Sequence, residues 1–265
     1  MRLRRPPALD VALRLGPEGA AGVPRQLIEA LEDEGIRLRP AAEGDEDGVV
    51  VAVGWDAAGP GVCAVLATGA PPPDGAAPAL PVLGPPWLGG TLPPGTDVEY
   101  APMPVHRRED LVLVHGETDL AIEAAEMLHE RRPALAFAAS GVREDLELPF
   151  PFLGVDRAPR AVAHAFASAT VALAPPVRGW RPAALAMLAC GQAVVAPDDA
   201  AARSALGDAA AFATDPRGAA DAAEAVIDDL ALRAERVRAG FARVGAPGWA
   251  ATGAALAAAL RDLAP

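Results

Sequence analysis

The sequence predicts an α/β fold in which parallel sheets are covered by helices on both faces. Short apolar runs alternate with amphipathic stretches along almost all of the 265 residues, and strands that alternate with helices form parallel sheets. Residues 69–95 are rich in proline and glycine and interrupt this alternation, which is more regular on their carboxyl-terminal side. We therefore expect two lobes, residues 1–104 and residues 105–265.

In the amino-terminal lobe, the apolar runs predict three strands and one amphipathic helix. The helix is expected at residues 22–34, where Leu27, Ile28 and Leu31 share one face. A brief apolar run at residues 79–83 lies within the proline-rich stretch, where continuous secondary structure is not expected. The expected strands of this lobe are residues 10–15, 49–54 and 63–67.

In the carboxyl-terminal lobe, the same patterns predict a longer series of alternating strands and helices. In one of the helices Ala121, Ala124, Ala125 and Leu128 recur at helical spacing. Ligands of such sheets bind at the carboxyl ends of the strands. The expected strands are residues 111–114, 134–138, 150–153, 171–174, 193–196 and 210–213, and the expected helices are residues 118–130, 158–168, 182–189, 201–206, 219–244 and 249–263.

The composition excludes several kinds of site. Lysine is absent, so all 23 basic residues are arginines, and a Schiff-base lysine or a P-loop lysine is ruled out. The formal net charge is −12. No arginine stripe with interleaved aromatic residues is visible, so no nucleic-acid partner is expected. An anionic ligand would need a local basic pocket within an acidic protein.

The remaining composition favours a cytoplasmic protein. Cys63 and Cys190 are far apart in apolar runs, which is typical of reduced, buried thiols. The first seven residues are basic but lack the apolar stretch of a signal peptide. Residues 162–175 are apolar but too short to span a bilayer, so no transmembrane segment is expected.

Several segments, in a consistent order from about Thr96 to the carboxyl terminus, resemble the donor-binding lobe of GT-B fold glycosyltransferases, specifically glycosyltransferase family four. The central match is residues 171–198, a strand and helix followed by a second strand. The resemblance implies two Rossmann-like lobes that face a cleft. The matching pieces are Leu188-Ala-Cys-Gly191, Val194-Val-Ala-Pro-Asp198, residues 208–216, Phe152-Leu-Gly-Val155 and Gly248-Trp249.

The amino-terminal lobe resembles the same family at one glycine-rich loop. Residues 16–22, which include Gly19 and Gly22, follow an expected strand and precede an expected helix. Glycines at such a turn let backbone amides approach an anion, although a plain tight turn explains the pattern equally well. The lobe is too short for the six or seven strands usual in the family, so a reduced first lobe is expected.

The resemblance implies a retaining glycosyltransferase that moves a sugar from a nucleotide-diphosphate sugar to an unknown acceptor, without a metal cofactor. One alternative is a non-catalytic relative that binds a nucleotide sugar or regulates a partner. A third interpretation, an unrelated α/β nucleotide-binding domain, explains the periodicity but not the ordered matches. The sugar, the acceptor and the oligomeric state are not readable from the sequence.

The sequence departs from the family at its acidic and cationic positions. The two glutamates of the family's donor site correspond to Arg178 and Ala186, and a third acidic position corresponds to Ser204. The family's arginine and lysine, which neutralise the donor diphosphate, have no counterpart in residues 114–119. A departing diphosphate gains negative charge and should be favoured by a cationic clamp, so the resemblance identifies the architecture more firmly than the activity.

Candidate donor-binding residues come from three places. Arg178 and Arg181 flank Gly179-Trp180 at the start of an expected helix, and we hypothesise that these arginines replace the missing clamp, because arginine forks bind phosphate bidentately. The alternative is that they are solvated loop residues. Gly154 is similar to a family position beside the nucleotide, and His115 ends an expected strand, although a structural histidine is the simpler interpretation.

No metal site is expected. The acidic residues Asp45 and Asp47 resemble an Asp-x-Asp metal motif, but their surroundings, residues 43–48, are typical of a polar turn. The four histidines show no metal-ligand spacing.

Overall fold

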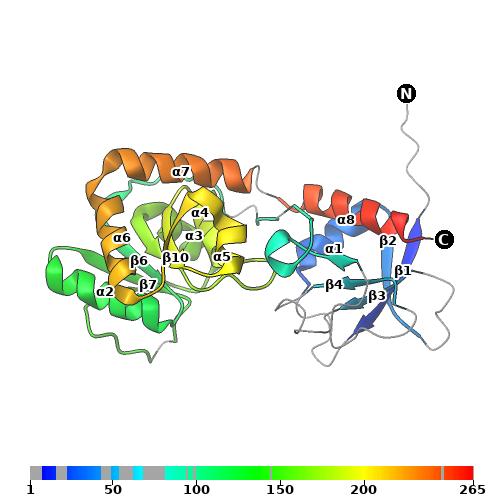
Figure 1. Cartoon of the computed structure of the whole chain (residues 1–265), viewed down its shortest axis with the longest axis horizontal. Coiled ribbons are helices and arrows are strands. Elements are labelled where there is room, and N and C mark those ends of the chain that lie inside the picture. Colours follow the sequence, from blue (N-terminus) through cyan, green and yellow to red (C-terminus); the bar gives the residue numbers. More distant parts are fainter. Residues whose placement is uncertain are drawn as a thin grey trace. The chain divides into compact units, whose positions relative to one another are not determined.

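The computed structural model describes residues 8–15, 23–42, 49–53, 62–67, 81–93, 95–97, 100–143, 145–245 and 248–264 (Figure 1). The chain divides into two units, each with its own parallel sheet. Unit 1 comprises Met1–Gly95, Arg178–Arg181 and Gly248–Pro265, and unit 2 comprises Thr96–Val177 and Pro182–Pro247. This division differs from the expected boundary at residues 104 and 105, because two later segments of the chain return to unit 1.

Unit 1 contains a five-stranded sheet in the order β2-β1-β3-β4-β5. All neighbouring strands are parallel. β3 is buried along its whole length, as expected for a central strand of a parallel sheet. A 3₁₀ helix, η2 (Pro86–Leu88), follows the last strand. The strands are β1 (Leu9–Leu15), β2 (Ile36–Pro40), β3 (Val49–Val53), β4 (Ala64–Leu66) and β5 (Val82–Leu83).

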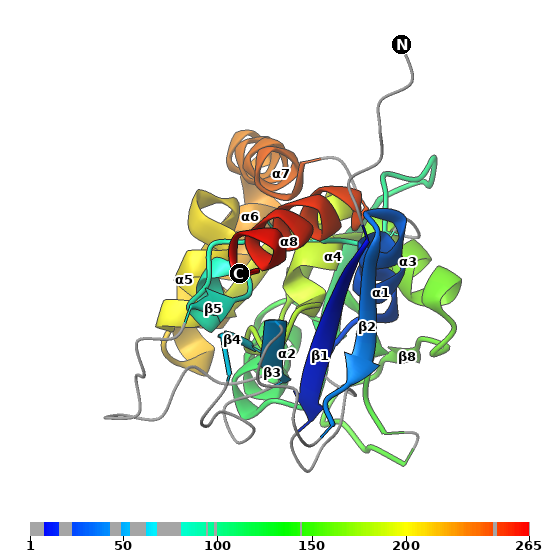
Figure 2. The same cartoon turned by 90° about the vertical axis from the view of Figure 1, so that its right-hand side faces the viewer.

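Helices α1 (Arg25–Asp33) and α8 (Ala250–Asp262) lie together on one face of this sheet (Figures 1 and 2). α8 is the end of the chain, yet it packs in unit 1. The hydroxyl of Thr252 donates a hydrogen bond to the carbonyl of Pro93 at 3.0 Å. Arg261 donates another to the carbonyl of Glu34, at the end of α1. The unit is therefore completed by residues more than 150 positions further along the chain.

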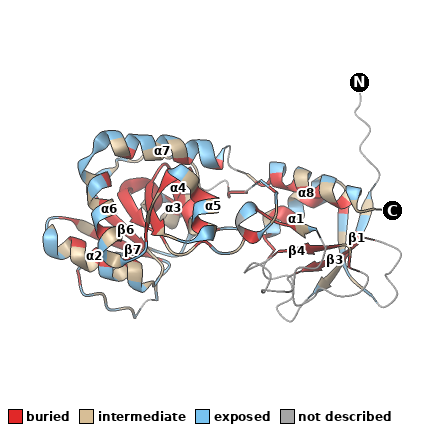
Figure 3. Ribbon diagram, viewed as in Figure 1, coloured by how far each residue is buried: buried red, intermediate tan, exposed pale blue. Residues whose placement is uncertain are grey.

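Unit 2 contains a six-stranded parallel sheet in the order β11-β10-β9-β6-β7-β8. β9 is fully buried, and the first four residues of β10 are buried too (Figure 3). The strands are β6 (Arg108–His115), β7 (Ala136–Ser140), β8 (Leu153–Gly154), β9 (Ala169–Leu173), β10 (Ala193–Pro197) and β11 (Ala210–Ala213).

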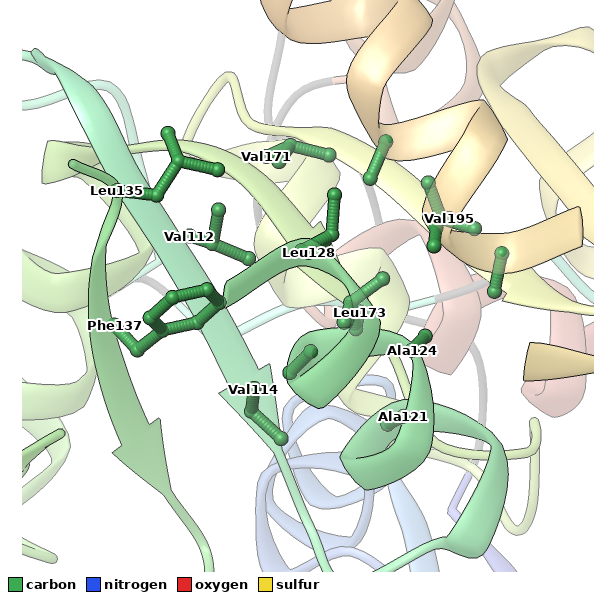
Figure 4. Close-up of a cluster of buried hydrophobic side chains, with 14 of the residues drawn as sticks. Val112, Val114, Ala121, Ala124, Leu128, Leu135, Phe137, Val171, Leu173 and Val195 are labelled. Atoms are coloured by element: carbon green, nitrogen blue, oxygen red, sulfur yellow. The ribbon is translucent and has the colours of Figure 1, made fainter. Parts of the chain in front are cut away.

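Helices α2 (Asp119–Arg131) and α6 (Pro216–Asp228) pack on one face of the unit 2 sheet, where alanines of α2 meet valines and leucines of the strands (Figure 4). In that view Ala121, Ala124 and Leu128 point toward Val114 and Leu173. Small helix residues let the helix approach the sheet closely. The helices of unit 2 are α2 (Asp119–Arg131), α3 (Pro159–Ser168), α4 (Ala183–Ala189), α5 (Ala200–Leu206), the 3₁₀ helix η3 (Gly207–Ala209), α6 (Pro216–Asp228) and α7 (Leu230–Val244).

Short polar side chains begin several helices of unit 2. Thr118 accepts a hydrogen bond from the backbone N–H of Ala121 at the start of α2. Asp199 and Asp215 accept the equivalent bonds in α5 and α6. These caps satisfy backbone donors that the first turn of a helix leaves unpaired.

Three sequence expectations differ from the structure. β2 follows α1 directly and was not expected, and β5 with η2 lies in the stretch where continuous secondary structure was not expected. The single helix expected at residues 219–244 is two helices, α6 and α7. They part at Asp229, whose carboxylate accepts hydrogen bonds from the N–H groups of Ala231 and Leu232 and so starts α7. In the described residues, no helix is long and apolar enough to cross a membrane.

The contact between α1 and α8 predicts a strong effect at Gly253. A Cβ atom added there would lie 2.5 Å from the Cβ of Ala30 and 3.1 Å from the Ala30 carbonyl carbon. Because the obstacle is another helix rather than a flexible side chain, Gly253→Ala should lower the free energy of unfolding by about 1–3 kcal/mol, despite alanine's better helix propensity.

The matched control is Gly218→Ala in α6, where the new Cβ meets only ordinary contacts at 3.6 Å and beyond. Urea unfolding of both variants measures the difference. Equal free energies of unfolding for Gly253→Ala and Gly218→Ala would show that α8 does not contact α1 at Gly253 as closely as described.

Candidate functional site at the carboxyl edge of the unit 2 sheet

Three neighbouring strands of unit 2 reach the carboxyl edge of the sheet with a glycine. Gly116 directly follows β6, Gly141 directly follows β7, and Gly154 ends β8. Gly116 and Gly141 have φ values of 77° and 65°, which side-chain-bearing residues rarely adopt. A Cβ at Gly154 would meet no atom within 4 Å. The edge therefore offers bare backbone at adjacent strand ends.

His115 and Ser140 lie side by side just before two of these glycines. They are partners in the β6–β7 register, and the Nδ1 atom of His115 is 2.7 Å from the Ser140 hydroxyl. The missing side chain of Gly141 makes room for the imidazole, since a Cβ there would lie 3.0 Å from Cε1 and 3.2 Å from Nε2. The ring also packs edge-on against Phe166, with centroids 5.4 Å apart.

Burial determines the charge of this histidine. It lowers the pKa of His115 from its ordinary value of 6.5 to about 4, because a buried imidazolium loses hydration. His115 is therefore neutral at pH 7, where it provides one hydrogen-bond donor and one acceptor. It suits a phosphate oxygen or a sugar hydroxyl as a hydrogen-bonding group, but it does not supply a positive charge.

Positive charge at this edge comes from the loops after β7 and β8. Arg143 binds the carboxylate of Glu117 through its backbone N–H and through Nε, the latter at 2.9 Å. The hydrogen bond from the Arg143 backbone, and then its guanidinium, hold the pKa of Glu117 below its usual range, and the charge of Arg157 adds to the effect. Arg157 donates to the carbonyl of Val142 at 3.0 Å.

Sequence reasoning missed these loop residues. From the sequence, the candidate cations for the donor were Arg178 and Arg181, whereas the structure brings Arg143 to Glu117 from 26 positions away. Ser140 was likewise not predicted to belong to the site. The signal available in the sequence was that each residue follows an expected strand, because the carboxyl ends of parallel strands share one edge.

The expected segment at residues 178–181 belongs to unit 1. Trp180 is 2% exposed, and its indole N–H donates to the carbonyl of Ala67. Arg178 and Arg181 are exposed, and Gly179 has a φ of 63°. The following helix, α4, begins at Ala183 in unit 2. A role of Arg178 and Arg181 in phosphate binding stays a prediction.

The remaining candidate site positions named from the sequence do not add a polar side chain to the carboxyl edge of the unit 2 sheet in the described residues. Ala186 is half-buried in α4, and the carbonyl of Ser204 accepts a hydrogen bond from Arg243. Gly19 and Gly22 lie outside the described residues, as do Asp45 and Asp47 of the acidic turn. Among the residues that the structure describes, no group of three or more His, Cys, Asp and Glu side chains is arranged to hold a metal ion.

The fold of this chain is similar to a known architecture. Comparison with solved structures shows that its two parallel, helix-flanked sheets match the GT-B fold of glycosyltransferases. The sequence itself matches no protein-family model and no curated protein.

Two solved structures support this assignment of the fold. A chain of the GtfA/B complex is 9% identical, with a TM-score of 0.59 over 86% of this chain and 57% of that chain. Sucrose-phosphate synthase from Thermosynechococcus elongatus is 17% identical, with a TM-score of 0.54 over 69% of this chain and 58% of that chain. The chain thus spans little more than half the length of either structure, which fits a shortened lobe.

The buried His115 predicts a specific dependence of stability on pH. Its folded pKa of about 4 lies below the ordinary value of 6.5, so the unfolded chain takes up the proton first as the pH falls. The contribution of the neutral, buried imidazole to the free energy of unfolding is complete above pH 6.5 and is lost as the pH falls toward 4. Between about pH 7 and pH 4, wild type should lose roughly 2–3 kcal/mol more free energy of unfolding than His115→Asn.

Urea unfolding across this pH range measures the difference, and the shared carboxylate titrations cancel between the two proteins. Identical pH profiles for wild type and His115→Asn would mean that the imidazole is hydrated rather than buried.

Proposed function

We propose that this chain is a glycosyltransferase that binds a nucleotide-diphosphate sugar at the carboxyl edge of the unit 2 sheet and transfers its sugar to an acceptor. The observation that carries the proposal is the row of three glycines at the ends of β6, β7 and β8. Glycine at a strand end lets the backbone approach a pyrophosphate closely, and ligands of open parallel sheets bind at this edge. The GT-B fold is consistent with such a donor.

In the proposed complex, the hydrogen-bonding groups of the edge have separate tasks. The His115–Ser140 pair gives hydrogen bonds without charge, which suits sugar hydroxyls or a phosphate oxygen. Arg143 and Arg157 supply the positive charge that the family places elsewhere. Glu117 competes with the donor for Arg143, so binding exchanges one anionic partner of this guanidinium for another.

The proposed reaction is a substitution at the anomeric carbon of the donor sugar. The bond from this carbon to the diphosphate oxygen breaks, and its electron pair stays on the leaving nucleoside diphosphate. The acceptor hydroxyl forms the new bond and releases its proton to the leaving diphosphate. Cations favour this step because negative charge grows on the leaving group. Retention of configuration, the sugar and the acceptor remain expectations from the resemblance, as does the cytoplasmic location.

A second candidate function is a nucleotide-sugar-binding protein without transfer activity. It is favoured by the residues at the family's acidic positions, where Arg178, Ala186 and Ser204 provide no carboxylate. The two candidates share the donor site but differ in chemistry. Calorimetric titration with a panel of nucleoside diphosphates and their sugars tests the shared site, and release of nucleoside diphosphate from the bound sugar donor separates them.

If no member of the panel binds, both the glycosyltransferase and the nucleotide-sugar-binding protein are wrong as functions of this chain. If a donor binds and nucleoside diphosphate is released only when an acceptor or water takes the sugar, the transferase is supported. Binding without any release in the presence of a broad acceptor mixture supports the second candidate.

The ion pair at the edge predicts opposite effects for its two partners. Arg143→Gln removes a cation and should weaken nucleoside diphosphate binding about tenfold to a hundredfold, because hydrogen bonds to charged groups contribute roughly 1.5–3 kcal/mol. Glu117→Gln removes the competing carboxylate and should strengthen binding. Arg131→Gln, which breaks an exposed ion-pair cluster with Asp221 and Glu224, is the control and should leave affinity unchanged.

The same titration distinguishes two sources of positive charge. If Arg178→Gln with Arg181→Gln abolishes binding while Arg143→Gln has no effect, the clamp comes from residues 178–181. Equal affinity in Arg143→Gln, Glu117→Gln and wild type would contradict the placement of the diphosphate beside this ion pair.

A further inference from the structure

The amino edge of the unit 2 sheet, at the opposite ends of the same strands, contains a second group of arginines. Arg107 directly precedes β6, and its Nη2 atom donates a hydrogen bond of 2.7 Å to the carbonyl of Gly191, just before β10. Arg107 thereby reaches across the start of β9, which lies between β6 and β10 in the sheet. Arg233 approaches the start of β6 from α7, where it lies 3.7 Å from Glu109.

Arg233 carries a buried charge that is poorly compensated. Its side chain is only 10% exposed, and the carboxylate that faces it, Glu109, is 3.7 Å away and 79% exposed. Within the described part of the chain, Nη1 of Arg233 is buried without a hydrogen-bond partner. A buried guanidinium is costly unless it is paired and hydrogen-bonded. Nη1 of Arg233 is therefore a buried donor that lacks an acceptor among the described residues.

Arg107 adds a second positive charge close to the first. Burial lowers the pKa of Arg107, and the positive charge of Arg233 lowers it further. Gln192, the residue after Gly191, is fully buried, and neither atom of its amide has a partner among the described residues. By contrast, the nearby Arg108 and Arg132 are already paired, with Asp110 and Asp228.

The packing of α7 is consistent with a site of fixed geometry. Gly191 has a φ of 77°, and a Cβ there would lie 2.8 Å from the Phe241 ring and 3.6 Å from Nη2 of Arg107. The absence of a side chain lets Arg107 and α7 approach the same turn. Arg233 is thus held by the helix that carries it, and Arg107, directly before β6, is held by its hydrogen bond to Gly191.

We propose that Arg107 and Arg233 form a binding site for a phosphate dianion, either inorganic phosphate or the phosphate of a small phosphomonoester. Two guanidinium groups opposed by one exposed carboxylate match a doubly charged oxyanion, and their forked donors fit its oxygens. The site is separate from the carboxyl edge, because β6 has eight residues and its ends are about 23 Å apart. It therefore does not depend on the proposed glycosyl transfer.

The test is the melting temperature of the whole chain as inorganic phosphate replaces chloride at constant ionic strength. A ligand of the native state raises the melting temperature, so wild type should show a rise that saturates with phosphate. Arg233→Gln and Arg107→Gln should lose this rise, and calorimetry should show at least about tenfold weaker phosphate binding, which corresponds to roughly 1.4 kcal/mol. Arg238→Gln, an exposed arginine of the same helix, should keep it.

Folding of the variants is checked in chloride alone. Removing a poorly compensated buried charge is not expected to destabilise the protein, so Arg233→Met should melt at the wild-type temperature or above it. Its melting temperature should not change when phosphate replaces chloride. Glycerol phosphate in place of inorganic phosphate distinguishes the two sources: a rise with both indicates an open phosphomonoester site, and a rise with inorganic phosphate alone indicates an enclosed one.

Three results would overturn the proposal. The first is a wild-type melting temperature that phosphate does not change. The second is a rise of equal size in Arg233→Gln and wild type. The third is a rise that survives in Arg233→Gln and Arg107→Gln but disappears in Arg143→Gln, which would move the phosphate to the carboxyl edge.

Discussion

The parallel pairing of β6 with β7 on one side and β9 on the other is the constraint on which the chemistry of unit 2 depends. Because all three strands run in the same direction, their first residues share one edge and their last residues share the other. The register places His115 opposite Ser140 at the carboxyl edge. The hydroxyl of Thr170 in β9 donates to the carbonyl of Arg108 in β6 at the amino edge. The two ends of one strand therefore contribute to two different polar sites.

The carboxyl edge combines bare backbone with neutral hydrogen-bonding groups. Glycines end three adjacent strands, and the buried His115 gives hydrogen bonds without charge. Arginines of the neighbouring loops bring charge, but Glu117 already binds Arg143. We propose that this edge binds a ligand that hydrogen-bonds to the backbone and is anionic enough to displace a carboxylate from its guanidinium. In the proposed donor site, the positive charge comes from the loops after β7 and β8.

Local sequence patterns predict most of the strands and helices, because buried strands and helix caps are properties of a few consecutive residues, but they did not predict β2. They are not sufficient at Asp229, where the alanine-rich pattern continues across the cap that separates α6 from α7. His115 was predictable as the end of a strand. Its partner Ser140 and the Glu117–Arg143 pair were not, because they depend on the β6–β7 register and on loops far apart in sequence. For the same reason, the bond from Trp180 to Ala67 in unit 1 was not foreseen.

The most direct test of the donor site is a crystal structure of the chain with the nucleoside diphosphate that binds best. We predict that the diphosphate lies against the backbone that follows β6 and β7, at Gly116 and Gly141, with His115 within hydrogen-bonding distance of the ligand. We also predict that the guanidinium of Arg143 turns from Glu117 toward a phosphate oxygen. A diphosphate bound anywhere other than the carboxyl edge of the unit 2 sheet would contradict the proposed donor site.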